Sequence, residues 1–216
     1  MDPDLVDRIY ESSFVPELWP RVLHELGRIA DGTGGTLFIT KADVQYWAAS
    51  PGSHNRAERW VNEGWFGRGQ IFARFFAAQH AGFMTELDAF TPDELNREPI
   101  YRDFWRPQGV GWAVGTAIPI PTGEKISIIV PRWTERGPFE RTFVQKLDEL
   151  RPHLARSALM SARLQLERAR IASETLAALG LPALVLELHA RSAISSLPHE
   201  AGYWLYPTAL DWYARI

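Results

Sequence analysis

The side chains that could bind a metal or act as nucleophiles are few in this sequence and widely spaced. The chain has no cysteine, and its histidines stand apart at positions 24, 54, 80, 153, 189 and 199. None of them forms the His-x-His or His-Glu-x-x-His spacing that typically holds zinc. The Gly-x-Ser-x-Gly turn of serine hydrolases is also missing. We therefore expect no metal, no cofactor and no catalytic residues.

Phosphate binding and acid–base catalysis are also disfavoured, because the residues that could support them are not suitably placed in the sequence. The glycine-rich stretches "DGTGGTLF" and "GVGWAVG" do not follow a strand and open a helix, as phosphate binding requires, so turns and close strand packing explain them better. An enzyme built from Arg132, Glu135 and Arg136, or from the scattered histidines, is the least favoured alternative because no acid–base set converges.

Charge and hydropathy point away from nucleic acid and membrane. The chain of 216 residues carries 23 basic and 26 acidic side chains, a net charge of -3. Its one arginine run, between Arg151 and Arg170, is spaced so that it spreads around a helix, which indicates a solvated face. The sequence shows neither a secretory signal nor an 18-residue apolar stretch. We expect a cytoplasmic protein without direct nucleic-acid contact.

The positive signal is aromatic. Nine tryptophans are present, and aromatic residues gather between positions 47 and 112. Such residues fill cores because they bury large areas, but indole and phenol rings also carry polar groups suited to the wall of a pocket. We predict a small organic ligand of unknown identity between sheet and helices. The predicted ligand-binding residues are Trp65, Phe72, Phe83, Tyr101, Phe104, Trp105, Trp112 and Thr116.

Hydrophobic periodicity and turn residues predict the elements that would hold these side chains. Helical spacing begins after Asp2-Pro3 and again at "PELWPRVLHELGRIADG", and two short helices are expected between His54 and His80. "GGTLFIT" and "VQYWAAS" are typical of strands, and 110–120 and 124–132 of a hairpin. Thr91, Pro92 and Glu94 form a capping box that begins another helix. The order favours an α+β fold with an antiparallel sheet and helices on its faces.

A long helix should follow Gly137-Pro138. Apolar residues recur near heptad spacing along it, which is typical of helices that pair with one another. We predict a homodimer. The predicted dimerisation residues are Leu159, Ala162, Leu166, Ala169 and Leu176.

Three stretches carry a family resemblance: "GWAVGTAIPIPTGEKISIIVPR", "GPFERTFVQKLDELRPHLARSALMSARL" and "LGLPALVLE". Together they resemble the amino-terminal sensory portion of bacterial LuxR-type transcriptional regulators. This resemblance implies a GAF/PAS-like fold in which a bound ligand or dimerisation controls a helix-turn-helix domain. It implies a sensory domain at 1–137, a dimerisation and signalling helix at 138–180 that packs on it, and an incomplete second PAS-like segment or divergent tail at 181–216.

The sequence departs from that family in two ways. In the branch that binds acyl-homoserine lactones an Asp-Pro pair grips the ligand amide, and Gly69-Gln70 stand there in this chain, so that ligand is not expected. No helix-turn-helix spacing follows Leu188, so a truncated regulator is expected. Two hypotheses remain: a ligand-binding sensory module, or a ligand-free dimerisation module that modulates a full-length regulator.

Overall fold

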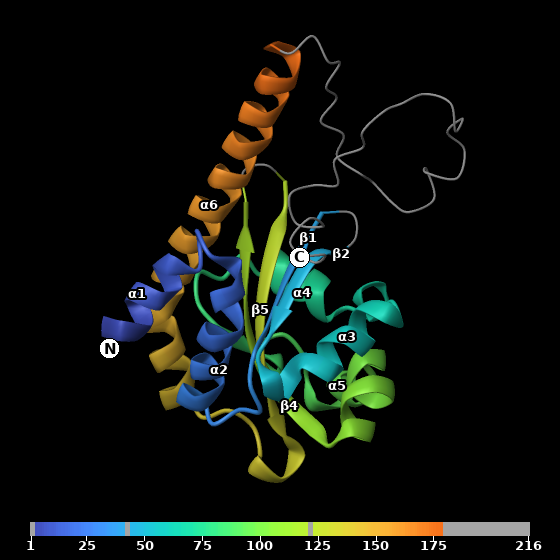
Figure 1. Cartoon of the computed structure of the whole chain (residues 1–216). Coiled ribbons are helices and arrows are strands. Elements are labelled where there is room, and N and C mark those ends of the chain that lie inside the picture. Colours follow the sequence, from blue (N-terminus) through green and yellow to red (C-terminus); the bar gives the residue numbers. More distant parts are fainter. Residues whose placement is uncertain (1–2, 42–43, 121–122, 179–216) are drawn as a thin grey trace, which may run out of the picture. The chain divides into compact units, whose positions relative to one another are not determined.

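The computed structural model describes residues 3–41, 44–120 and 123–178. These residues form a five-stranded sheet in the order β2-β1-β5-β4-β3, and every neighbouring pair of strands is antiparallel (Figure 1). The α+β class and the antiparallel sheet predicted from the sequence are therefore confirmed. The strands are β1 (Thr36–Thr40), β2 (Val44–Ala49), β3 (Met84–Thr85), β4 (Val110–Pro119) and β5 (Lys125–Trp133).

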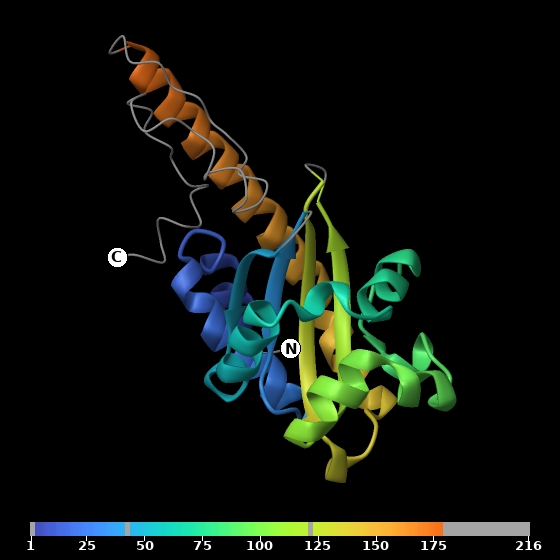
Figure 2. The same ribbon diagram turned by 90° about the vertical axis from the view of Figure 1, so that its right-hand side faces the viewer.

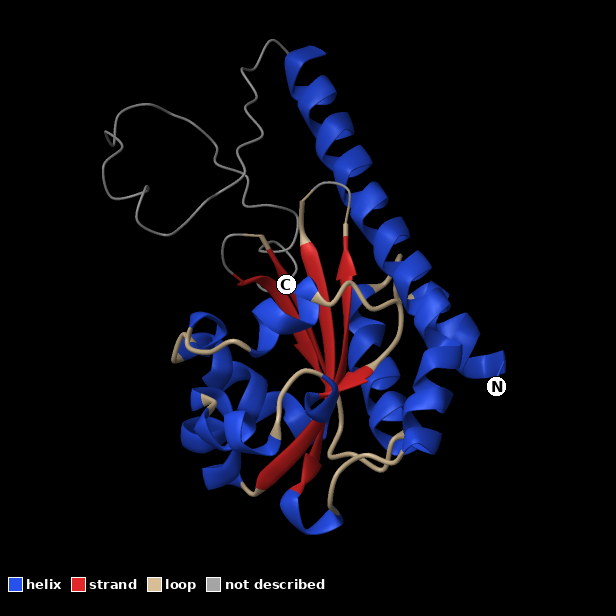
Figure 3. Cartoon of the chain, turned by 180° about the vertical axis from the view of Figure 1, so that it is seen from behind, coloured by secondary structure: helices blue, strands red, loops and turns tan. Residues whose placement is uncertain are grey.

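Helices cover both faces of this sheet. One face carries α1, α2 and the beginning of α6, and the other carries α3, α4, α5 and the π-helix η5 (Figure 2). Seen from behind, the strands lie between these two helical layers (Figure 3). The helices are α1 (Pro3–Glu11), α2 (Trp19–Ile29), α3 (His54–Asn62), α4 (Ile71–Ala77), α5 (Pro92–Arg97), η5 (Ile100–Trp105) and α6 (Arg141–Ala178).

Local chemistry explains where the helices beside the candidate site begin and end. The Thr91 hydroxyl accepts from the backbone N–H of Glu94, and the Glu94 carboxylate accepts from the backbone N–H of Thr91. This capping box confirms the predicted start of α5. Gly64, with φ of 68°, follows α3 in the left-handed conformation that glycine adopts at low cost, so the chain turns before α4.

The β4–β5 hairpin sets which side chains face each helical layer. Gly115 pairs with Ile129 and Thr116 with Ile128. Because side chains alternate along a strand, Ala113, Gly115 and Ala117 share one face of β4, while Val114, Thr116 and Ile118 share the other. Ala113 belongs to the buried cluster formed with α3, α5 and η5, so the small residues face that layer.

The chain divides into two compact units, Met1–Leu159 and Met160–Ile216. In the first unit α6 packs on α1: the Ser157 hydroxyl donates to the Ile9 carbonyl over 2.6 Å, and the Tyr10 hydroxyl lies 3.0 Å from His153 Nδ1. No helix among the described residues has the length and hydropathy needed to span a bilayer. The strand predicted at "ALVLEL" and the segment 181–216 lie outside the described residues.

Candidate ligand-binding site

Trp60 is the centre of an aromatic cluster on the α3–α5 face of the sheet. Its ring centroid lies 5.1 Å from that of Phe104, 5.7 Å from those of Phe72 and Trp105, and 6.2 Å from that of Phe38. All four contacts are edge-on or tilted and none is a face-to-face sandwich, the arrangement that aromatic rings avoid. The cluster joins α3, α4, η5 and β1 into one layer.

A cavity of about 30 Å³ lies between this cluster and the sheet. It exists because Ala113, Gly115 and Ala117 of β4 project little or no side chain toward the aromatic rings above them. The cavity is lined by Trp60, Ile71, Phe72, Phe75, Tyr101, Trp105, Ala113, Gly115, Thr116, Ala117, Ser127, Ile128 and Ile129. Its volume suits one or two water-sized groups.

Three residues of this lining bury polar atoms that lack a hydrogen-bond partner in the described structure: Trp60 Nε1, the Tyr101 hydroxyl and the Ser127 hydroxyl. All three residues are at most 4% exposed. A buried polar group without a partner costs about 1–3 kcal/mol, so native proteins rarely keep several together. Residues that line this apolar cavity therefore also carry buried polar atoms without a hydrogen-bond partner.

Glu86 lies beside this site and is buried. Its carboxylate accepts from the backbone N–H of Ala113 over 3.1 Å, and burial raises the pKa of Glu86 to about 7. Burial and then the nearby Glu86 charge raise the pKa of Tyr101 well above its ordinary value. The Tyr101 hydroxyl and the Glu86 carboxylate lie close enough to shift each other's pKa, although the hydroxyl makes no hydrogen bond of ordinary geometry.

The structure brings four of the eight predicted ligand-binding residues to the cavity: Phe72, Tyr101, Trp105 and Thr116. The Thr116 hydroxyl is already committed, since it donates to the Gly82 carbonyl and accepts from Arg151 Nε. Phe104 lines a neighbouring cavity instead.

The other three predicted residues do not line either cavity. Trp65 is buried in the same apolar cluster, 5.2 Å from the Phe104 ring, and its indole N–H donates to Glu63. Phe83 is buried beside α6, where its backbone N–H donates to Asp148. Trp112 is half-buried at the start of β4, and its indole N–H donates to the Thr134 carbonyl.

The sequence analysis did not predict the residues of the cavity floor, Ala113, Gly115 and Ala117, or the central ring of Trp60 as part of the site. A clear signal was present, because Ala113, Gly115 and Ala117 alternate along a strand otherwise rich in larger residues. A stripe of small residues facing aromatic side chains indicates space. Ser127 gave no such signal, since its place opposite Ala117 follows only from the strand register.

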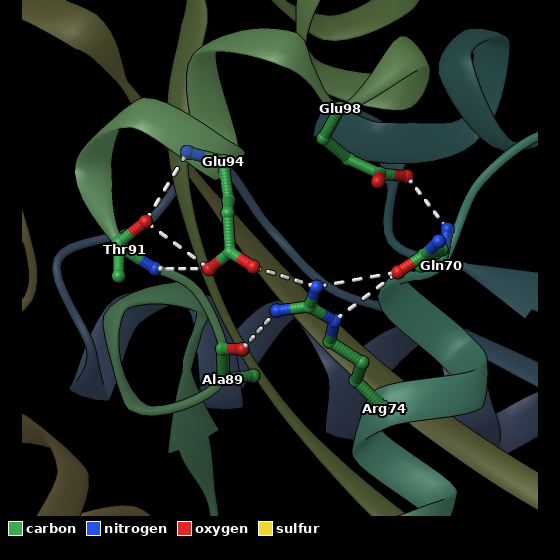
Figure 4. A network of polar contacts seen from close by, with 6 residues as sticks. All are labelled: Gln70, Arg74, Ala89, Thr91, Glu94 and Glu98. Carbon is green, nitrogen blue, oxygen red and sulfur yellow. Dashed lines mark hydrogen bonds and ion pairs between the residues drawn. The ribbon is translucent and has the colours of Figure 1, made fainter.

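Helix α4 forms the roof of the cavity, and a polar network fixes it. Arg74 of α4 donates to the Ala89 carbonyl and to Glu94 of α5 (Figure 4). Its guanidinium also lies 4.1 Å from the centre of the Phe90 ring. The pKa of Glu94 is lowered to about 2, chiefly because its carboxylate accepts the hydrogen bond from Arg74. Ile71 is the one residue of α4 that is buried, and the network adds polar contacts from α4 to Ala89 and α5.

The position aligned with the lactone-gripping aspartate does not face the cavity. The Gln70 side chain is exposed and accepts from Arg74, while its backbone N–H donates to Glu98. Among the described residues there is also no cluster of three or more side chains able to hold a metal.

Comparisons with known proteins support the fold. No family model and no curated protein sequence matches this chain. The ligand-binding domain of VqsR from Pseudomonas aeruginosa is similar in structure, with a TM-score of 0.55 and 14% identity over 74% of this chain and 94% of that one. The chain therefore shares the fold of the VqsR domain.

Two further solved structures are less similar to this chain. SdiA from Escherichia coli has a TM-score of 0.46 and 14% identity over 76% of this chain and 77% of that one. A GAF domain/HD domain protein from Geobacter sulfurreducens has a TM-score of 0.44 and 12% identity over 74% of this chain and 98% of that one.

The unsatisfied Ser127 hydroxyl makes a first prediction about stability. Ser127→Ala should raise the free energy of unfolding of the ligand-free protein by about 1 kcal/mol, because it removes a buried polar group that has no partner. Ser50 is the matched control: it is also buried, but its hydroxyl accepts from the Gly35 N–H over 2.9 Å. Ser50→Ala should destabilise the protein. Urea unfolding measures both, and destabilisation by Ser127→Ala would contradict the prediction.

The buried carboxyl of Glu86 makes a second prediction, about pH. Its folded pKa of about 7 lies above the ordinary 4.5, so the folded state binds more protons in that window. Stability from this group is complete below pH 4.5 and is lost as pH rises toward 7, on the order of 3 kcal/mol. Glu86→Gln should lack this loss. Thermal unfolding of the wild type and of Glu86→Gln between pH 4.5 and 8 measures this difference. The same dependence of stability on pH in both proteins would contradict the prediction.

Proposed function

We propose that this chain is the cytoplasmic sensory module of a LuxR-type transcriptional regulator, which binds a small organic ligand and neither contacts DNA by itself nor catalyses a reaction. The observation that carries the proposal is the cavity on the α3–α5 face. Its floor of small residues, its aromatic walls and its three unsatisfied buried polar atoms are what a ligand site needs. The fold shared with the VqsR domain supports the same assignment.

Ligand binding requires the cavity to enlarge. Its 30 Å³ compares with about 300–1,000 Å³ for typical small-molecule pockets. Helix α4 is the element that can yield at least cost, because it is short, mostly not buried and contributes Phe72 and Phe75 to the roof. Displacing α4 would break the Arg74 contacts to Ala89 and Glu94. The proposed site is therefore closed in the described structure.

A physical connection leads from the cavity to α6. Ala117 lines the cavity, and its carbonyl accepts from Arg151 Nη2 of α6 over 3.1 Å. Arg151 Nε donates to the Thr116 hydroxyl on the neighbouring residue of β4. A ligand that presses on the floor of the cavity would shift this strand and, through Arg151, the helix that follows. Differential contact of this kind is what couples binding to a change elsewhere.

One observation favours a second candidate function. The cavity is small because the aromatic rings pack closely on one another, as in an ordinary core. In that case the chain would be a ligand-free dimerisation module that modulates a full-length regulator. The two candidates differ in whether a small molecule can enter, which is directly measurable.

Filling the cavity provides the test. Ala113→Val adds two methyl groups at the cavity floor, so it should reduce ligand affinity at least tenfold while the protein stays folded. Indole, benzyl alcohol, hexanoate and phenylacetate are titrated while tryptophan fluorescence is followed, since Trp60 and Trp105 line the cavity. Trp112→Ala is the matched control, because this indole lies outside the cavity and its loss should leave affinity unchanged.

The outcomes separate the two candidates. A saturable fluorescence change for at least one compound, lost in Ala113→Val and kept in Trp112→Ala, supports the sensory module. If no compound gives a saturable change, or if Ala113→Val binds as the wild type does, the ligand-free module is the better description. Circular dichroism of each variant checks that the fold is intact.

Dimerisation through α6 is part of the same proposal. Leu159 is 38% exposed, unusual for a leucine in a helix whose earlier leucines are buried. The structure describes the backbone but not the side chains of the other predicted dimerisation residues, Ala162, Leu166, Ala169 and Leu176. Replacing both Leu159 and Leu166 with glutamate should convert a dimer into a soluble monomer in sedimentation experiments. Leu87→Glu, at a similarly exposed leucine off this helix, is the control. A wild-type monomer, or an unchanged mass in the double variant, would contradict the interface.

A further inference from the structure

Arg56 is a partly buried arginine that is surrounded by neutral groups. It lies on α3, and its Nη2 donates to the Thr33 hydroxyl over 2.6 Å and to the Gly52 carbonyl over 2.7 Å. Its guanidinium lies 5.3 Å from the centre of the Trp133 ring. These contacts fix the position of the guanidinium, but none of them supplies a negative charge.

Within the part of the chain that the structure describes, Arg56 makes no ion pair, and its Nε is buried without a hydrogen-bond partner. The buried Arg132 differs because it pairs with Asp31, and Arg151, which also makes no ion pair among the described residues, has the Asp148 charge near it. Burial lowers the pKa of Arg56, and no neighbouring acid acts against that effect. A cation removed from water without a counter-charge is unfavourable, so an anion at this place would be stabilising.

The space for such an anion lies beside the first cavity. A second cavity of about 20 Å³ is lined by Thr36, Phe38, Arg56, Ala57, Trp60, Phe104, Trp105, Ile129 and Pro131. It shares Trp60, Trp105 and Ile129 with the first cavity. The second cavity therefore has a cationic wall, while the first is apolar with neutral polar atoms. Its volume suits a group of one or two oxygen atoms.

We propose that the second cavity is an anion subsite, in which Arg56 binds the carboxylate of a ligand whose apolar body occupies the first cavity. The ligand class of the proposed sensory site is then a small organic acid. This inference rests on the proposed function, since it assigns the ligand of that site. A carboxylate oxygen would accept from the buried Nε–H, a charge-assisted hydrogen bond that is shorter and stronger than one between neutral groups.

A matched pair of compounds tests the charge without any mutation. Phenylacetate and phenylacetamide have the same ring and almost the same shape, but only the first is an anion at pH 7.5. Isothermal titration calorimetry of the wild-type protein should show phenylacetate binding at least tenfold more tightly than phenylacetamide. Added salt should weaken only the binding of phenylacetate.

Arg56→Gln should bring the ratio of the two affinities close to one, because glutamine keeps a hydrogen-bond donor but not the charge. The control is Arg59→Gln on the same helix. Arg59 is exposed and paired with Glu63, so its replacement should leave the preference for the anion unchanged. A thermal unfolding curve for each variant verifies that the Thr33 and Gly52 contacts of Arg56 are not needed for folding.

The failures of the two proposals are distinguishable. Equal affinities for phenylacetate and phenylacetamide in the wild type would overturn the anion subsite and leave the ligand-binding module in place. A preference for phenylacetate that survives in Arg56→Gln would also overturn the assignment to Arg56. Failure of both compounds to bind, while indole or benzyl alcohol still changes the fluorescence, would exclude organic acids as the class. Failure of every compound would overturn the proposed function itself.

Discussion

The architecture of the site depends on one constraint: the side chains of the aromatic cluster around Trp60 are large, and those of the β4 face that they cover are small. Large rings from α3, α4 and η5 meet a strand face that carries only Ala113, Gly115 and Ala117. Rings of fixed shape cannot collapse onto so flat a surface without leaving space, because side chains occupy discrete conformations. The cavity is therefore a result of residue sizes on two elements that are brought together by the sheet.

Buried polar groups give this space its chemical character. In the described residues the buried side-chain nitrogen and oxygen atoms without a hydrogen-bond partner belong to Arg56, Trp60, Tyr101 and Ser127, and each of these residues lines at least one of the two cavities. A core under selection for stability alone would have apolar residues at such places, since each orphaned group costs about 1–3 kcal/mol. Their concentration at one place is the strongest physical argument that the site binds a ligand.

The α6 side of the sheet is built differently. There the buried polar groups are satisfied: Ser157 donates to the Ile9 carbonyl, and Arg151 donates to the Thr116 hydroxyl and the Ala117 carbonyl. The two faces of the same hairpin thus serve different purposes, one a satisfied structural interface and the other an unsatisfied cavity. Adjacent residues of β4 contribute to both faces, which is the basis of the proposed coupling between the cavity and α6.

The sequence alone determined the elements: alternation predicted β1, β2 and the β4–β5 hairpin, and the box at Thr91 and Glu94 predicted the start of α5. The sequence also predicted Phe72, Tyr101 and Trp105 as ligand-binding residues, because aromatic residues are concentrated in this part of the sequence, and the structure places all three at the first cavity. Only the tertiary structure decided that Trp112 lies outside it and that Trp60, Ser127 and Arg56 belong to it. Strand register and helix placement set which residues distant in sequence face one another, and local residue patterns do not encode those pairings.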